Sequence, residues 1–232
     1  MTNSHRTRHT NWFLISTAVF ITALLTSNII AVKMTVVCGM PVTAGIVIFP
    51  ISYIAADMIT EIYGYARLRM VIWLGFICNL LAVGAIALAS AMPSAPFWND
   101  QAAFTQILGA TPRLLLASFT AYLAGEFSNS YIMAKMKVAT DGKYLWMRSI
   151  GSTLIGELLD SAIFMTIGFY GIIPPQAMAA AIVTQWLMKS LYEASATPLL
   201  YAAVRFLKKK EGIDHYDRDT NFNPLKFLPA DQ

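Results

Sequence analysis

MVIWLGFICNLLAVGAIALASA, residues 70–91, is a continuous apolar run without a charged side chain. A helix needs about 20 mostly apolar residues to cross the hydrocarbon core of a bilayer. Backbone polar groups must be satisfied inside the membrane, and a run this long and continuously apolar fits a helix and not an alternating barrel strand. We therefore interpret residues 70–91 as a transmembrane helix.

The composition of the whole chain agrees with this interpretation. Of its 232 residues, 56% are hydrophobic and 13% are charged, and the mean hydropathy is +0.55. A soluble domain has about 25% charged residues, so this chain has too little polar surface for a water-soluble globule. We predict an all-α, polytopic membrane protein of about six spans. The candidate spans are residues 12–31, 42–62, 70–91, 114–133, 148–170 and 178–207.

Basic residues predict the orientation of these spans. With the N-terminus in the cytoplasm, fourteen of the 17 lysines and arginines fall on the inner side, and only Lys33 and Arg113 fall on the outer side. Such an excess marks the cytoplasmic face, so both termini are expected inside. The basic balance therefore serves topology and does not indicate nucleic-acid binding. Residues 1–11 and 208–232 are expected to be cytoplasmic tails around a transmembrane domain of residues 12–207, and the C-terminal tail is expected to be solvated.

The loops and tails show no sign of metal or cofactor chemistry. The two cysteines have no metal-ligand spacing, and the three histidines lie in the polar tails. No P-loop occurs, so we expect no ATP hydrolysis in this chain. The long outer link, residues 92–113, carries Phe104, Ile107 and Leu108 at helical spacing, which predicts a short helix on the membrane surface.

Charged residues inside the predicted spans are the most informative feature. Each costs about 2.5–3.5 kcal/mol at the centre of a helix on insertion scales, so a purely structural protein has little reason to carry them. They are six acids and one base: Asp57, Glu61, Glu126, Glu157, Asp160, Glu193 and Lys189.

The spacing of these residues predicts one shared polar interior. Residues four apart lie on one face of a helix, and three spans repeat polar or aromatic residues at about this interval. Glu157 and Asp160, three apart, share a face of the fifth span. Four polar faces are most economically turned towards a single cavity. The other stripes are Tyr53, Asp57 and Glu61; Tyr122, Glu126 and Asn129; and Lys189, Glu193 and Thr197.

Local pairing offers a simpler explanation for some of these charges. Lys189 and Glu193 are four apart and can pair with each other. Glu61 and Glu126 lie near the inner boundary, where Arg67 or Lys135 can neutralise them. Glu157 and Asp160 have no base nearby in the sequence, so they need a cation, a proton, water or a ligand. Aromatic residues in the spans usually serve packing.

Several motifs resemble the signature of the queuosine precursor transporter family of small six-span proteins, which is grouped with vitamin-uptake-like transporters. The resemblance covers nearly the whole chain, and it rests on the order and spacing of its motifs together. The motifs are Phe49-Pro50-x-x-Tyr53-x-x-x-Asp57-x-x-Thr60-Glu61-x-Tyr63-Gly64, Glu126-Phe127-Ser128-Asn129-Ser130, Gly151-Ser152-Thr153, Gly156-Glu157-x-x-Asp160, Lys189, Tyr192-Glu193, Thr197-Pro198, Tyr216-Asp217 and Phe222-Asn223-Pro224.

The resemblance implies uptake of 7-cyano- and 7-aminomethyl-7-deazaguanine across a bacterial inner membrane. It also implies a fold similar to the six-helix substrate-binding subunits of energy-coupling-factor transporters. A deazaguanine presents a ring N–H beside an exocyclic amine, and one carboxylate can accept both. We expect Glu157 or Asp160 to do this. Aromatic walls and a second acid would complete the site, for which the candidates are Phe49, Tyr53, Phe164, Trp186, Asp57, Glu193 and Lys189. Glu61, Glu126 and Asn129 are candidates for a proton-linked or structural role.

Other functions remain open at this stage. The chain can be a secondary carrier, a binding subunit that needs a separate ATP-driven module, or a carrier for another small polar solute. An intramembrane aspartyl protease is disfavoured because Glu157-Leu158-Leu159 precedes Asp160 where Gly-x-Gly is expected, and a purely structural assembly protein is also disfavoured. We expect no enzymatic activity, a purine-like substrate, the lipid bilayer as surroundings, and a homodimer as one possible assembly.

Overall fold

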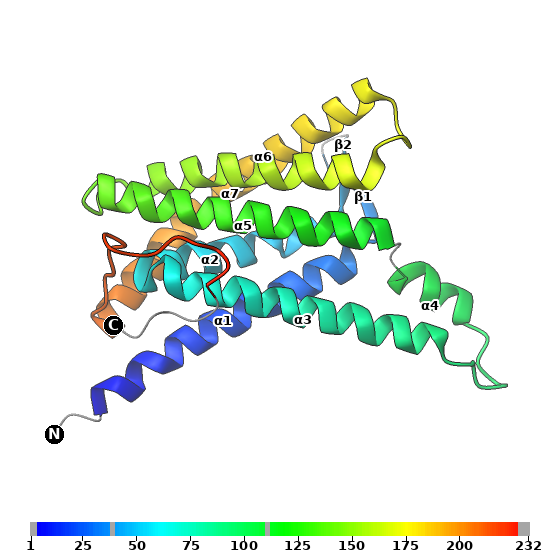
Figure 1. The fold of residues 1–232 in the computed structure, drawn as a ribbon, viewed down its shortest axis with the longest axis horizontal. Helices are drawn as coiled ribbons and strands as arrows, with labels where there is room; N and C mark the ends of the chain where they lie inside the picture. The colour runs from blue at the N-terminus through cyan, green and yellow to red at the C-terminus, as the bar shows by residue number, and fades with distance from the viewer. Residues whose placement is uncertain (1–3, 38–39, 110–111, 227–232) are drawn as a thin grey trace.

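The computed structural model describes residues 4–37, 40–109 and 112–226, and it confirms the predicted helical class (Figure 1). The long helices run roughly side by side in a bundle, and the short helix α4 stands apart at one end. The helices are α1 (Ser4–Ile30), α2 (Phe49–Tyr63), α3 (Tyr65–Ala91), α4 (Gln101–Leu108), α5 (Pro112–Ala139), α6 (Leu145–Phe169) and α7 (Pro175–Glu211), with a 3-10 turn η1 (Ala44–Val47) before α2.

Among the described residues, four segments are long and apolar enough to cross a membrane. They are Asn11–Ile30 of α1, α3, the stretch Gln101–Ala139 that contains α5, and α6. Helix α2 has 15 residues, about 22 Å at 1.5 Å per residue, which is short of a full span. Helix α7 has 37 residues but carries the Lys189 and Glu193 stripe. Crossing by α2 and α7 stays a prediction from the sequence.

The second predicted span begins later than expected. A two-stranded antiparallel hairpin of β1 (Met34–Val37) and β2 (Met40–Thr43) precedes it, with Met34 opposite Thr43. The run Thr35-Val36-Val37 is β-branched and favours a strand. Pro50 lies in the first turn of α2, where proline is tolerated. The expected helix from residue 42 is therefore wrong in its first seven residues, and the helix begins at Phe49 with Pro50 in its first turn.

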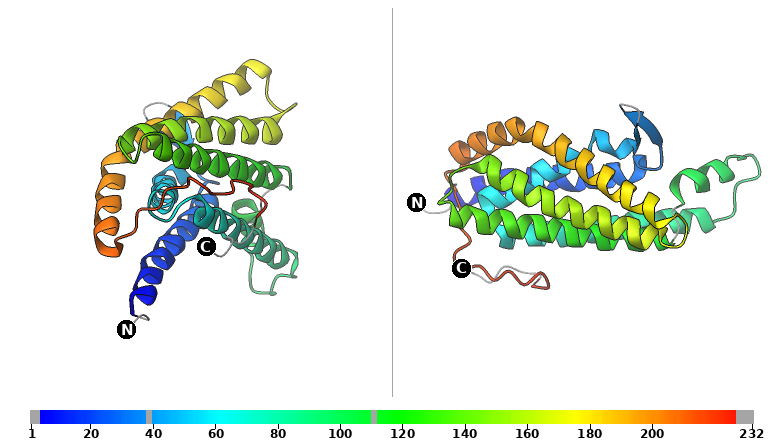
Figure 2. Two further views of the ribbon diagram at one scale, coloured as in Figure 1. Left: turned by 60° about the vertical axis from the view of Figure 1, so that its left-hand side comes forward. Right: turned by 90° about the horizontal axis from the view of Figure 1, so that it is seen from above.

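Helix α2 occupies the centre of the bundle, and its position explains its polarity. It contacts α1, α3, α5 and α7, and most of its residues are buried, including Tyr53, Asp57 and Glu61. Helix α7 bends along its length, with Pro198 inside it (Figure 2), as proline in a helix interior requires. A short polar helix surrounded by other helices hides its charges from lipid.

Helices α5 and α6 approach closely at two glycines. A Cβ on Gly156 would lie 2.9 Å from Asn129 Cβ, and a Cβ on Gly125 would lie 3.0 Å from Asp160 Cβ. Small residues of this kind let helix backbones pack tightly in membranes. The contact brings the polar face of α5 against that of α6. The short helix predicted for the outer link is also confirmed, as α4, and its place on the membrane surface stays a prediction.

The described part of the C-terminal tail packs along α3 (Figure 1), although most of its side chains stay exposed or partly exposed, as expected for a solvated tail, and beyond α7 Asp217 is the buried one. The Arg69 guanidinium donates to the Asn221 and Asn223 carbonyls at 2.7 and 2.9 Å, and Trp73 Nε1 donates to the Pro224 carbonyl at 2.7 Å. Local sequence patterns could not predict these hydrogen bonds, because donor and acceptor lie about 150 residues apart in the sequence.

Asp217 anchors the tail at the start of α3. Its carboxylate accepts the Tyr65 backbone N–H at 3.0 Å and the Thr220 hydroxyl at 2.7 Å, as an anion does at a helix N-terminus. Burial alone would raise the pKa of Asp217. These hydrogen bonds and the adjacent His215 ring outweigh burial and hold the pKa below its ordinary value.

Gly64, between α2 and α3, makes this anchor possible. Its φ of 85° and ψ of 168° lie in a region that is essentially restricted to glycine, and a Cβ there would lie 2.3 Å from the His215 ring. Gly64→Ala is expected to destabilise the protein by about 1–3 kcal/mol and to release the tail, as measured by the melting temperature in detergent and by proteolysis of the tail. Gly84→Ala is the matched control, because its Cβ would meet nothing within 4 Å. Equal melting temperatures for the two variants would contradict the role of Gly64.

Candidate substrate site in the bundle core

Two helices bring a lysine and two acids together in the bundle. Lys189 of α7 forms ion pairs with Glu157 Oε2, at 3.1 Å, and with Asp160, both on α6. Glu157 is fully buried and Lys189 is partly buried. Lys189 therefore pairs across helices and not with Glu193 on its own helix. Glu157 and Asp160 have no base nearby in the sequence, but the fold places Lys189 beside them.

Aromatic rings of α2 form one side of this cluster. The Lys189 Nζ lies 4.8 Å from the centre of the Phe49 ring, within the range of a cation–π contact. The Phe49 and Tyr53 rings are 4.7 Å apart, and Tyr53 is buried beside Glu157. The structure thus brings together five predicted site residues: Phe49, Tyr53, Glu157, Asp160 and Lys189. We call these five the base-site cluster.

Asp57 lies deeper in the bundle and is held by two neutral donors. Its Oδ1 accepts from Asn129 Nδ2 at 3.0 Å and its Oδ2 from the Ser149 hydroxyl at 2.7 Å. Similarly, Glu193 Oε1 accepts from the Thr153 hydroxyl at 2.6 Å. Each of these acids ties its own helix to α6. Ser149 and Thr153 were not predicted as site residues, although they recur four apart on the face that carries Glu157.

Several buried polar atoms near the base-site cluster lack a hydrogen-bond partner among the described residues. A fully buried polar group without a partner costs free energy and calls for an explanation. The atoms concerned are Glu126 Oε2, Asn129 Oδ1, both carboxylate oxygens of Glu157, Ser161 Oγ and Glu193 Oε2. The unpaired atoms are mainly acceptors, so the core can receive protons or N–H donors of a ligand.

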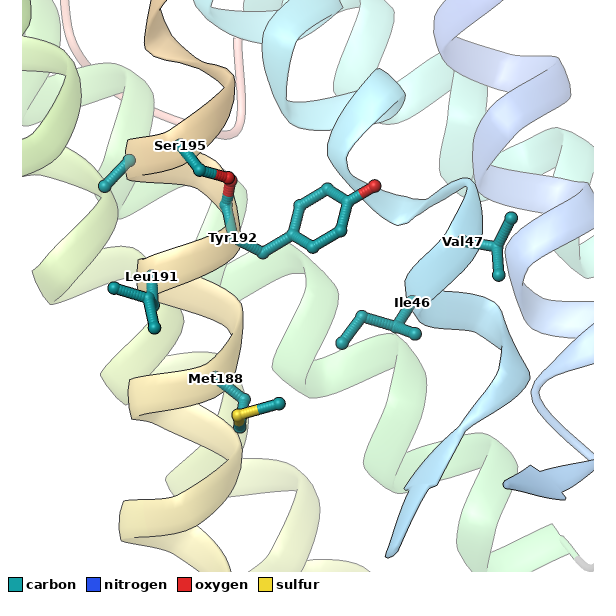
Figure 3. Close-up of a pocket in the computed structure, with 7 residues that line it drawn as sticks. Ile46, Val47, Met188, Leu191, Tyr192 and Ser195 are labelled. Carbon is teal, nitrogen blue, oxygen red and sulfur yellow. The ribbon is translucent and has the colours of Figure 1, made fainter. Parts of the chain in front are cut away.

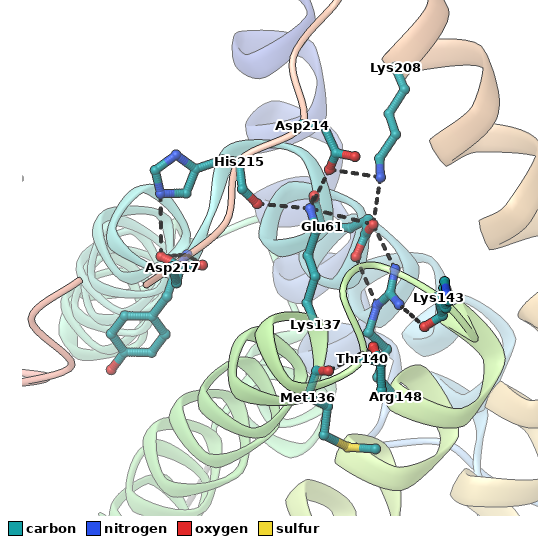
Figure 4. A network of polar contacts seen from close by, with 11 residues as sticks. Glu61, Met136, Lys137, Thr140, Lys143, Arg148, Lys208, Asp214, His215 and Asp217 are labelled. Carbon is teal, nitrogen blue, oxygen red and sulfur yellow. Dashed lines mark hydrogen bonds and ion pairs between the residues drawn. The ribbon is translucent and has the colours of Figure 1, made fainter. Parts of the chain in front are cut away.

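Glu61 belongs to a separate ion network at the other end of α2 (Figure 4). Its carboxylate accepts from Arg148 at 2.7 and 3.0 Å and from Lys208 at 2.7 Å, and Lys137 Nζ lies 3.5 Å away. The partners expected from the sequence, Arg67 or Lys135, are wrong, because the fold selects cations of α5, α6 and α7. This network is structural, since it joins four helices and the tail through Asp214.

Phe164 and Trp186 lie outside the contacts of the cluster. The Phe164 ring packs against Phe169 with centroids 6.1 Å apart, and Trp186 Nε1 donates to the Leu154 carbonyl at 2.8 Å. The Phe164 contact lies within α6 and the Trp186 contact joins α7 to α6, so both rings serve packing, as the packing interpretation expected. Neither places a ring against Phe49 or Tyr53 in the part of the chain that the structure describes.

An apolar groove of about 610 Å³ opens between η1 and α7 (Figure 3). Tyr192 and Ile46 point into it from opposite sides. Its other lining residues are Val47, Met188, Leu191, Ala194 and Ser195. The groove offers few polar groups to a purine-like base. Its lining residues Val47 and Met188 are close in sequence to Phe49 and Lys189 of the base-site cluster. No charged residue stands among these lining residues.

Comparison with known proteins identifies the family of the chain. Residues 43–203 match the family described as "Putative vitamin uptake transporter". The chain belongs to this family. The matched segment includes the base-site cluster, Asp57, Glu126 and Glu193, so the buried polar core lies within the part of the chain that defines the vitamin uptake family.

Two curated proteins of similar sequence carry more specific names. The chain is 28% identical to "Probable queuosine precursor transporter" of Bacillus subtilis (strain 168), over 82% of this chain and 83% of that protein. It is 26% identical to "Queuosine precursor transporter" of Escherichia coli (strain K12), over 63% of this chain and 64% of that protein. These matches confirm the resemblance found in the motifs. No solved structure matches the chain.

Proposed function

We propose that this protein is a membrane transporter of queuosine precursors and that the base-site cluster binds the base. The observation that carries the proposal is Glu157: a fully buried carboxylate that is ion-paired with Lys189 at Oε2 but accepts no hydrogen bond of standard geometry at either oxygen, in the core of a vitamin uptake family member. Two N–H groups side by side on a deazaguanine match these oxygens as a charge-assisted, bidentate contact.

The neighbours of Glu157 complete a plausible set of contacts for such a base. Lys189 can donate to the ring carbonyl that stands next to the ring N–H. The Phe49 and Tyr53 rings offer a flat wall for the ring system. Asp160 keeps Lys189 charged and in place. In this arrangement each polar edge of the base meets a group of opposite hydrogen-bonding character.

We also propose that the protein lies in a bacterial inner membrane with both termini in the cytoplasm. The excess of basic residues on the predicted inner side supports this orientation. The ion network of Glu61 and the docked tail would then face the cytoplasm. Cysteine labelling of the N- and C-terminal tails in intact and permeabilised cells tests the orientation.

Glu157→Gln is expected to weaken base binding by about tenfold to a hundredfold, because a hydrogen bond to a charged group contributes about 1.5–3 kcal/mol. The measurement is thermal stabilisation of the detergent-purified protein by the two deazaguanines, guanine and adenine. A ligand at a hundred times its Kd stabilises the folded state by about 2.7 kcal/mol.

Glu211→Gln serves as the matched control for this experiment. Glu211 is also buried, but it pairs with the Tyr63 hydroxyl at 2.5 Å, away from the cluster. We expect it to keep the stabilisation by a deazaguanine. Equal stabilisation of wild type and Glu157→Gln would remove Glu157 from the site, and stabilisation by an unrelated solute alone would change the proposed substrate.

A further inference from the structure

The buried core of the bundle contains more acid than its bases can neutralise. Five carboxyl groups share this core with one lysine, Lys189, which is ion-paired with Glu157 and Asp160. The neighbouring network of Glu61 and Asp214 with Arg148, Lys137 and Lys208 has a single base in excess. Three carboxylates therefore remain uncompensated if all are ionised. The five acids are Asp57, Glu126, Glu157, Asp160 and Glu193.

Uncompensated carboxylates in a dry core are too costly to persist. An isolated buried carboxylate is so unfavourable that it takes up a proton or a cation instead. Among the described residues, no three metal-ligating side chains converge on a point that could hold a metal ion. The acids are spread over α2, α5, α6 and α7, which suits separate protonation and not a shared ion.

Glu126 is the acid with the least compensation. It lies on α5, is 2% exposed, and its Oε2 has no partner in the described part of the chain. The charged groups that face it are acids: Asp57 from α2, and Glu157 and Asp160 from α6. Asn129, one turn along α5, also keeps an unpaired oxygen, which is an acceptor suited to a carboxyl O–H. The other titratable neighbours among the described residues are Tyr122 on the same helix, Tyr53 on α2 and Glu193 on α7.

Glu193 differs from Glu126 in having a donor. Its Oε1 accepts from Thr153, and Lys189 lies one turn away on α7. Asp57 is held by Asn129 and Ser149, while Asp160 has Lys189. Glu126 alone among the five acids receives no side-chain hydrogen bond or ion pair from the described residues. The proton is therefore most stable there.

We propose that Glu126 holds the proton that couples transport of the base to a proton gradient, a role that rests on the proposed function. Glu157 must be ionised to accept two N–H groups of the base. Its negative charge then opposes ionisation of Glu126, so base binding favours the protonated form. Because linkage is reciprocal, the proton also favours base binding, and the two ligands cross the membrane together.

The test uses the full-length protein in proteoliposomes with 7-cyano-7-deazaguanine, which is neutral. Counterflow of labelled base without a gradient reports binding and translocation. Uptake under an outside-acid pH gradient reports coupling, and one proton per base across one pH unit supports about tenfold accumulation. We expect the wild type to show counterflow, gradient-driven accumulation and base-dependent proton entry. A sodium gradient alone is expected to drive none.

Glu126→Gln mimics the permanently protonated carboxyl. We expect it to retain counterflow and to lose both accumulation and proton entry, while Glu211→Gln retains all three. Proton-driven accumulation by Glu126→Gln would overturn the assignment to this residue. Counterflow by the wild type without proton entry, measured independently of any variant, would overturn proton coupling. Absence of counterflow in the wild type would instead overturn the proposed substrate and the inference with it.

Discussion

Glu61→Gln is expected to lower the free energy of unfolding by about 3–5 kcal/mol, the cost of removing one partner from a buried ion network. The Glu61 carboxylate is fully buried and lies within 3.5 Å of Arg148, Lys137 and Lys208. The amide oxygen of glutamine still accepts hydrogen bonds, but it carries no negative charge to compensate three cations. Since Arg148 and Lys137 are themselves buried, they would remain as charges without an adequate counter-ion.

The measurement is the apparent melting temperature in detergent, together with the fraction of monodisperse protein after purification. The control is Asp141→Asn, which removes an ion pair with Arg218 at 3.4 Å between two exposed side chains. Pairs of this kind contribute little to stability. We expect a large fall in melting temperature for Glu61→Gln and almost none for Asp141→Asn. Similar shifts for both would show that the network is dispensable.

The sequence predicted which residues lie inside the bundle, because helical periodicity determines the face on which a side chain lies. Tyr53, Asp57 and Glu61 are indeed buried together on α2. Periodicity says nothing about which helix packs against that face. The partner of Glu61 was expected to be Arg67 or Lys135, but Arg148 comes from α6. Pairing across helices is a tertiary property and could not be predicted from spacing.

The docking of the tail and the presence of the hairpin were missed for a related reason. Local composition made residues 208–232 look solvated, yet Asp217 and the carbonyls near Asn223 meet donors of α3. The β-branched run Thr35-Val36-Val37 did signal a strand, but it stands directly before an apolar stretch that extends the hydropathy signal. Hydropathy measures preference for lipid, whereas the beginning of a helix depends on local turn chemistry.

Lys189→Met is expected to abolish detectable binding of the base and to destabilise the protein. The variant leaves Glu157 and Asp160 together without a cation. Truncating one partner of a buried charge pair costs about 2–5 kcal/mol, or about thirtyfold to several-thousandfold in affinity. Without the cation, Glu157 and Asp160 would take up protons. A protonated Glu157 no longer offers the charged acceptor that the base requires. Lys209→Met, an exposed site on the same helix, is the matched control and should bind normally.

Adding Asp160→Asn to Lys189→Met separates stability from binding. The double variant removes one of the two uncompensated carboxylates, so it should recover much of the lost melting temperature, as neutralising both members of a buried pair costs less than removing one. It should not recover base binding, because the donor to the ring carbonyl is still missing. The double-mutant cycle over thermal stability and deazaguanine binding tests both statements. Recovery of binding in the double variant would mean that Lys189 serves only to neutralise Asp160 and does not touch the base.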